Sequence, residues 1–116
     1  RDIETVLPAA LLATLPHPWV VIDDVHDNLL GILNHFHHQG LQAGDYLIIE
    51  DTNQFLWEVW DDWDDQALIQ RGSRRMAELR GWLMHHSDFY GIDTHYQDMY
   101  GYNVSKNWNS ILKRLM

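Results

Sequence analysis

The sequence has 116 residues, of which 46% are hydrophobic and 22% are charged. This is the size and composition of one small globular domain and not of a disordered chain. The absence of Cys excludes a disulfide scaffold and a thiolate metal site, and favours a reducing, cytoplasmic location. A formal net charge of −9 argues against nucleic acid as a partner. No apolar run approaches the roughly 18 residues of a membrane span.

The first expected element is a helix over residues 3–15, because Leu recurs there on one helical face. Pro8 must either lie in the first turn of this helix or break it. Two further prolines, Pro16 and Pro18, separate this segment from the apolar run at 19–22.

Residues 19–51 predict one strand–helix–strand unit. The short apolar runs at 19–22 and 46–49 are typical of buried parallel strands. Between them, Asp27-Asn28 is a good N-cap pair for a helix with apolar residues at helical spacing through Phe36. Parallel pairing of the two strands is the natural connection.

Both predicted strands end in carboxylates, Asp23 in the first and Glu50 with Asp51 in the second. Parallel strands end at the same edge of a sheet, where ligands bind in open α/β folds. Grouped carboxylates suit a hard cation such as Mg²⁺, and Asp24 is a second candidate at the first position. His26 lies nearby and can serve as a general base. Ordinary strand ends and helix caps are the alternative interpretation of the same residues.

The second half of the chain predicts a helix from Ser73 to His85, one or two strands within residues 88–104, and a final strand or short helix near 110–115. An acidic stretch at 53–66 carries Trp residues that line either a pocket or a surface loop.

The His and Arg side chains of the two long helices are expected to be exposed to solvent. Three His residues near the end of the first long helix are expected to be exposed and to interact with the helix dipole: His35, His37 and His38. The Arg residues of the second helix are expected to form a solvated face: Arg71, Arg74, Arg75 and Arg80.

Three segments together resemble the cephalosporin hydroxylase family. They are HPWVVIDDVH at 17–26, GDYLIIEDT at 44–52 and the tail YGYNVSKNWNSILKR at 100–114. The resemblance implies an α/β fold, the C-terminal part of a Rossmann-like class I methyltransferase, in which parallel strands are followed by an antiparallel pair. Residues 1–116 would then be a single partial domain, with the N-terminal cofactor-binding half absent.

The same resemblance implies an S-adenosylmethionine-dependent O-methyltransferase of natural product biosynthesis. The implied substrate is a small molecule, with a natural product or sugar hydroxyl as the acceptor. A divalent cation such as Mg²⁺ would be held by Asp23, Glu50 and Asp51, and His26 would be the catalytic base. No Gly-rich loop follows a strand in this sequence, so no cofactor-binding residue is assigned and the fragment alone is expected to be inactive.

Two other classes of function remain open at this point. Asp23-Asp24 at a strand end also suits a Mg²⁺-dependent phosphotransfer or receiver-like domain, and the acidic Trp-rich stretch suits a non-catalytic interaction module. The sequence does not determine whether the protein is a homo-oligomer.

Overall fold

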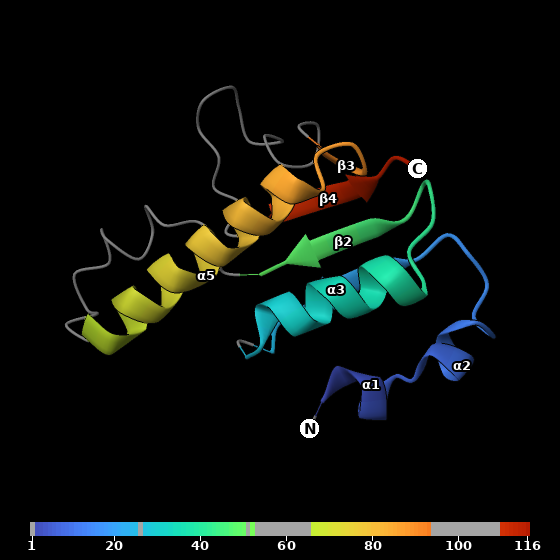
Figure 1. Ribbon diagram of the computed structural model, residues 1–116, viewed down its shortest axis with the longest axis horizontal. Coiled ribbons are helices and arrows are strands. Elements are labelled where there is room, and N and C mark those ends of the chain that lie inside the picture. Colours follow the sequence, from blue (N-terminus) through green and yellow to red (C-terminus); the bar gives the residue numbers. More distant parts are fainter. Residues whose placement is uncertain (1, 26, 51, 53–65, 94–109) are drawn as a thin grey trace.

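The computed structural model describes residues 2–25, 27–50, 52, 66–93 and 110–116. In chain order the elements are α1 (Ile3–Val6), α2 (Ala9–Leu12), β1 (Val20–Asp23), α3 (Leu29–Gln39), β2 (Tyr46–Ile49), α5 (Gln66–His85), β3 (Tyr90–Ile92) and β4 (Ser110–Arg114). Within the described residues, the strands form one four-stranded sheet in the order β1-β2-β4-β3 (Figure 1).

The sheet is mixed. β1 pairs with β2 in parallel, while β4 runs antiparallel to both β2 and β3. This confirms the α/β class and the parallel unit followed by an antiparallel pair. It also settles the expectation for residues 110–115, because Ser110–Arg114 form a strand.

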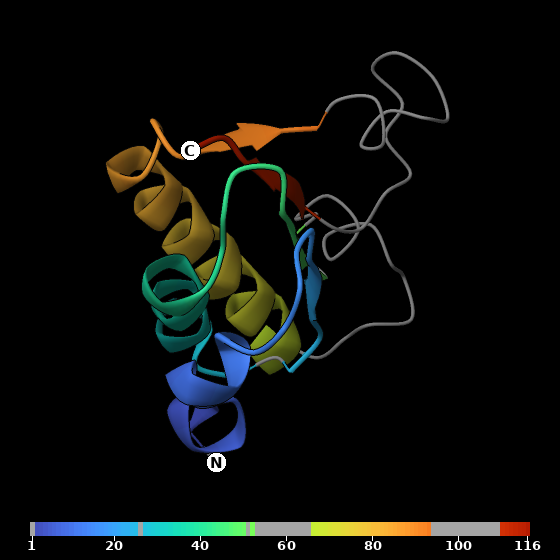
Figure 2. The same ribbon diagram turned by 90° about the vertical axis from the view of Figure 1, so that its right-hand side faces the viewer.

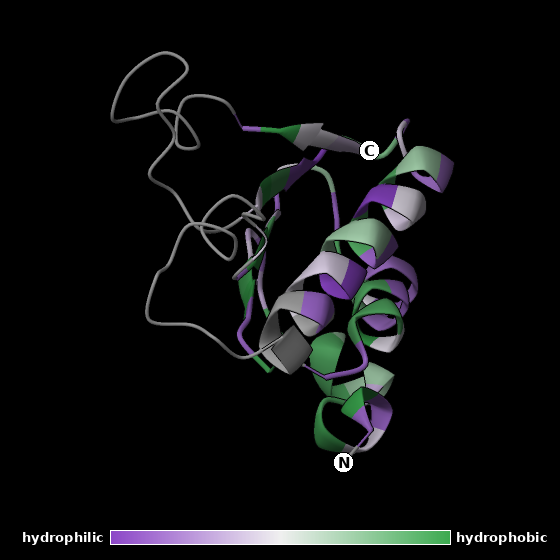
Figure 3. Cartoon of the chain, turned by 90° about the vertical axis from the view of Figure 1, so that its left-hand side faces the viewer, coloured by the Kyte–Doolittle hydropathy of each residue, from purple (hydrophilic) through white to green (hydrophobic). Residues whose placement is uncertain are grey.

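The helices α3 and α5 lie side by side on one face of the sheet (Figure 2). Four fully buried aliphatic side chains lie at the centre of the core: Leu33, Leu47, Ile49 and Leu112. Both helices carry hydrophilic as well as hydrophobic residues (Figure 3). The helix layer therefore buries one face of the sheet, as the amphipathic patterns predict.

The prediction of one continuous helix over residues 3–15 is wrong. The chain forms two short helices there, and Pro8 is the N-cap of the second. A proline in a helix interior lacks the N–H donor and collides with the preceding turn, so the helix breaks at Pro8. The segment is held to α3 by His35, whose Nε2 lies 2.6 Å from the Leu7 carbonyl oxygen.

Other boundaries also differ from expectation. α5 begins at Gln66, before the predicted Ser73. The N-cap of α3 is Asn28, one residue of the predicted Asp27-Asn28 pair. Asn28 has a φ of 45°, and its side chain accepts a hydrogen bond from the Gly31 N–H. Of the predicted 88–104 strands, Tyr90–Ile92 is observed and 94–104 lie outside the described residues. No helix in the described part of the chain is long and apolar enough to cross a bilayer.

Candidate active site

The candidate site lies at the carboxyl edge of the parallel pair β1–β2. The register aligns Val20 with Tyr46 and ends with Asp23 opposite Ile49. The ladder continues one step further, since the Glu50 N–H donates to the Asp23 carbonyl oxygen at 3.0 Å. The carboxylate-bearing ends predicted from the sequence therefore do lie beside each other.

Asp23 is buried, with 2% of its surface exposed. Its Oδ1 accepts a hydrogen bond from the Val25 N–H at 3.1 Å. Its Oδ2 accepts one from Nη2 of Arg75 at 2.8 Å. The Asp23 carboxylate is thus engaged on both oxygens, in an ion pair with a helix of the layer that covers the sheet.

Arg75 is the functional side chain for which the sequence-based expectation is wrong. The sequence predicts a solvated helix face, but only 6% of Arg75 is exposed. Its Nε also points to the Glu50 carbonyl oxygen at 3.5 Å, a long contact. A signal exists in the sequence, because Arg75 shares a helical face with the buried Leu79 and Trp82. A charged residue on such a face indicates a buried partner.

Asp24 and Glu50 each lie one residue beyond the last aligned pair. Successive side chains of a strand point to opposite faces, and Asp23 and Ile49 are both buried toward the helix layer. Asp24 is exposed and Glu50 is half-buried. At this edge, the Asp23–Arg75 pair lies on the helix side of the sheet.

Two predicted site residues, His26 and Asp51, lie outside the described residues. The chain on either side of Asp51 is anchored. Glu50 is held through its N–H, and the buried Thr52 donates to the Ile49 carbonyl oxygen at 3.2 Å and pairs with the Ser110 hydroxyl at 2.6 Å. In the described part of the chain, no group of three His, Asp or Glu side chains is gathered as a metal site. The Trp residues at 57, 60 and 63 also lie outside it.

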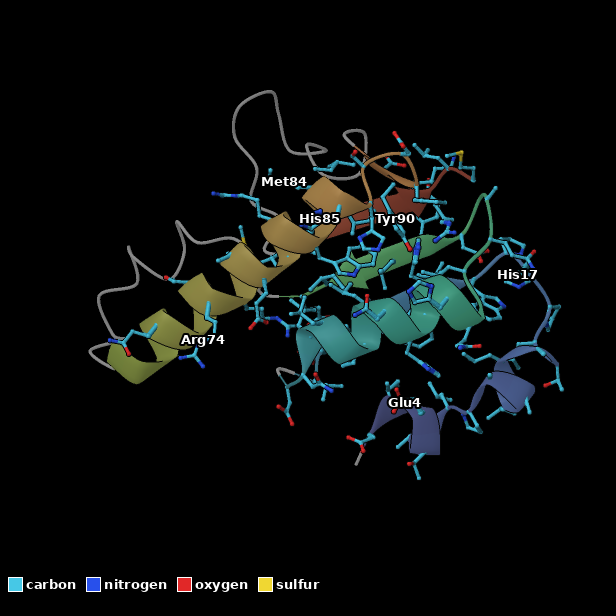
Figure 4. The ribbon with its side chains drawn as sticks, viewed as in Figure 1. Glu4, His17, Arg74, Met84, His85 and Tyr90 are labelled. Carbon is cyan, nitrogen blue, oxygen red and sulfur yellow. The ribbon has the colours of Figure 1, made fainter. Side chains whose placement is uncertain are left out.

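A polar pocket of about 280 Å³ opens beside Arg75, between the start of α3 and the middle of α5. Arg74, which lies toward the amino end of α5, also borders it (Figure 4). The full lining is Asp27, Asn28, Leu29, Leu30, Arg74, Arg75 and Glu78. Acidic and basic side chains both contribute, so the pocket does not select one sign of charge.

A second buried polar group lies at the opposite end of the helix layer. Arg114 donates through Nη1 to the Tyr90 hydroxyl at 2.9 Å and also to Nδ1 of His37. Burial, followed by the nearby Arg114, His86 and His38, lowers the pKa of His37 from 6.5 to about 4. Burial raises the pKa of Tyr90. The expectation of exposed His side chains is therefore wrong for His37 and for His35, which is 6% exposed.

No protein-family model matches the sequence, and no curated protein matches it. The apo structure of CmcI-N160 matches with a TM-score of 0.56 and 24% sequence identity, covering 100% of this chain and 42% of that chain. This chain has the fold of the matching part of CmcI-N160. The SAH structure of CmcI-N160 matches 89% of this chain and 41% of that one, at 26% identity and a TM-score of 0.48.

CmcI-N160 is a cephalosporin hydroxylase, so the structural likeness agrees with the family resemblance of residues 17–26 and 44–52. The chain spans less than half of the CmcI-N160 chain. What the likeness establishes is the fold, including the parallel β1–β2 pair beside the antiparallel strands.

Proposed function

We propose that this chain is the C-terminal part of an S-adenosylmethionine-dependent methyltransferase that methylates a hydroxyl group of a natural product or sugar. One observation carries the proposal. The β1–β2 register brings Asp23-Asp24 and Glu50 together at one sheet edge, within a fold shared with CmcI-N160. One of the two CmcI-N160 structures contains SAH, the demethylated form of the proposed methyl donor.

The cation site of the proposed enzyme would use Glu50 and Asp51 with either Asp23 or Asp24 as the first ligand. Their oxygen ligands suit Mg²⁺, and they lie at the aligned ends of β1 and β2. Asp23, the first ligand implied by the family resemblance, would have to release its Oδ2 from Arg75 to bind a cation. A bound divalent cation supplies Lewis acidity, which lowers the pKa of a coordinated hydroxyl.

His26 is the proposed general base. It lies two residues after Asp24 in the sequence, on the connection from β1 to α3. A neutral imidazole there would take the proton of the substrate hydroxyl as the methyl group is transferred from the sulfonium to the oxygen. Correct placement of oxygen and methyl group would contribute most of the acceleration.

The described residues do not fit S-adenosylmethionine itself. They contain no Gly-rich turn between a strand and a helix that could accommodate the cofactor. We therefore assign cofactor binding to an N-terminal half outside residues 1–116, and we assign to this chain the cation site and part of the acceptor site.

The receiver-like alternative does not fit the sheet. Receiver domains are doubly wound parallel sheets, whereas β4 here is antiparallel to both of its neighbours. An interaction module remains the competing function, and it predicts neither cofactor nor cation binding.

The test uses the intact protein. SAH binding is measured by calorimetry, and conversion of S-adenosylmethionine to SAH is measured with a panel of catechols and sugars, with Mg²⁺ or with a chelator. We expect SAH binding and Mg²⁺-dependent turnover. Glu50→Gln should abolish the Mg²⁺-dependent turnover, whereas Glu4→Gln, on the exposed α1, should leave it unchanged. An intact protein that binds no SAH is an interaction module or another enzyme.

A further inference from the structure

A second polar pocket, of about 370 Å³, opens between α3 and the two short helices at the start of the chain. Of these two, α1 lies beside α3 (Figure 1). The lining includes Gly31, Asn34, His35 and His38 on one face of α3, together with Glu4 of α1 and Ala9 of α2. No described residue of the candidate site lines this pocket, so it is a separate feature of the described chain.

His35 gives the pocket a hydrogen-bond acceptor in a fixed position. The residue is 6% exposed, and its Nε2 lies 2.6 Å from the Leu7 carbonyl oxygen. A carbonyl oxygen only accepts, so Nε2 carries the proton and Nδ1 of the neutral imidazole carries a lone pair. Nδ1 makes no hydrogen bond to a described residue, yet Trp19 Nε1 is the one fully buried and unpaired side-chain nitrogen among them. The Nδ1 lone pair is therefore open to the pocket that His35 lines.

Asn34 gives the pocket a hydrogen-bond donor. Its Oδ1 accepts a hydrogen bond from Nε1 of Trp82 at 2.8 Å. The indole nitrogen only donates, so this contact fixes which end of the Asn34 amide is turned toward α5. The NH₂ group at the other end of the amide remains available to a molecule in the pocket that Asn34 lines.

This pair of groups selects a ligand by its hydrogen-bonding chemistry. A hydroxyl group can donate to His35 Nδ1 and accept from an Asn34 N–H. An ammonium group only donates, so it would leave the Asn34 donors unpaired. A carboxylate only accepts, so it cannot pair with Nδ1, and the negative charge of Glu4 at the border would repel it. A small molecule with several hydroxyl groups therefore matches the pocket better than either ion.

We propose that the pocket between α3 and the two N-terminal helices binds a small neutral polyol, whose hydroxyl groups donate to His35 Nδ1 and accept from the Asn34 amide. The pocket has the volume of a site for a small ligand, and a ring that carries hydroxyl groups fits within it. The proposal does not rest on the methyltransferase function, because it involves none of the residues of the candidate site.

The test titrates the intact protein with myo-inositol, a ring that carries only hydroxyl groups, and follows the proton–nitrogen NMR spectrum. We expect saturable shifts of the Gly31 N–H and of the His35 ring nitrogens, with a dissociation constant on the order of 1 mM. Quinate, a ring polyol that also carries a carboxylate, should bind at least about tenfold more weakly. The absence of saturable shifts would overturn the site, and equal binding of quinate would overturn the class of ligand.

His35→Gln tests the acceptor. Its amide nitrogen can replace Nε2 as the donor to Leu7, but it provides no acceptor at the position of Nδ1. Affinity for myo-inositol should fall about tenfold, the value of one hydrogen bond. His85→Gln makes the same chemical change at an exposed position outside the pocket lining and should leave the affinity unchanged. Equal affinities in the two variants would overturn the role of His35.

Ala9→Leu tests the location without altering a polar group. The larger side chain should fill part of the pocket and weaken myo-inositol binding by at least about tenfold. Ala10→Leu adds the same atoms at the next exposed position of α2, outside the pocket lining, and should bind like wild type. Thermal unfolding of all four variants verifies that they are folded. Binding that Ala9→Leu leaves unchanged would lie elsewhere on the protein and would overturn the proposal, even if His35→Gln failed to fold.

Discussion

His37 and Arg114 hydrogen-bond to each other across 77 positions of the sequence, with Nη1 of the guanidinium donating to Nδ1 of the imidazole. The Tyr90 hydroxyl lies 2.9 Å from the same Nδ1 and accepts a second hydrogen bond from Arg114. This arrangement requires a neutral His37, because a protonated Nδ1 could not accept. It links α3 to the antiparallel strands β3 and β4.

The first prediction concerns the pH dependence of stability. The pKa of His37 is lowered from 6.5 to about 4 on folding, so between these values the unfolded chain binds more protons. Stability should therefore be complete above pH 6.5 and decline as the pH falls toward 4. Urea unfolding of the intact protein at pH 4.5 to 7.5 measures this decline.

His37→Asn provides the control, because its amide oxygen can accept from Arg114 but does not titrate. The loss of stability on acidification should be smaller in this variant than in wild type. An identical pH dependence in the two proteins would assign the effect to other His residues.

The second prediction concerns Asp45, whose carboxylate is completely buried. It accepts hydrogen bonds from Nδ1 of His17 at 2.7 Å and from the N–H groups of Trp19 and Gln42, both at 2.8 Å. Asp45→Ala leaves two N–H donors without their acceptor and should cost about 2–4 kcal/mol. Urea unfolding measures this loss. Asp45→Asn, which retains one suitable acceptor, should lose less; an equal loss would mean that cavity formation dominates.

The third prediction compares two glycines. A Cβ at Gly40 would lie 2.6 Å from Cη2 of Trp19, whereas a Cβ at Gly81 would meet nothing within 4 Å. Gly40→Ala should therefore destabilise the protein by about 1–3 kcal/mol, through displacement of the buried Trp19 ring. Gly81→Ala, within α5, should stabilise it by about 0.5–1 kcal/mol. Thermal unfolding distinguishes the signs, and a neutral Gly40→Ala would mean that the ring moves freely.

The fourth prediction tests whether the rest of the protein covers β1. Among the described strands β1 pairs only with β2, and its Val20 and Ile22 are 64% and 58% exposed. If the proposed N-terminal half packs there, Ile22→Lys should destabilise the intact protein by more than about 1 kcal/mol. Met84→Lys, at a residue that is 74% exposed on α5, should change stability by less than about 0.5 kcal/mol. Equally small effects in the two variants would mean that no other part of the intact protein packs on this face of β1.

The parallel unit could be predicted because its signals are local. The apolar runs at 19–22 and 46–49 end at polar residues, and the observed strands Val20–Asp23 and Tyr46–Ile49 match them closely. The strand Ser110–Arg114 could not be distinguished from a short helix, because its antiparallel pairing with β2 and β3 depends on distant residues.

The position of the candidate site at one edge of the sheet could be predicted from the sequence, but the side-chain contacts within the site could not. Register places Asp23 beside Glu50, as expected for parallel strands. The buried partner of Asp23 is Arg75, which lies 52 residues away in the sequence. Local spacing cannot identify such a partner; the buried face of α5 could have indicated only that one exists.

The sheet order has a consequence for synthesis on the ribosome. β4 lies between β2 and β3, yet it comes after both in the sequence. A nascent chain that extends only to Ile92 can form the β1–β2 pair, but β3 then has no observed neighbour to join. The antiparallel half must assemble late, and until then the edge of β2 that will receive β4 stays open to mispairing with other nascent chains.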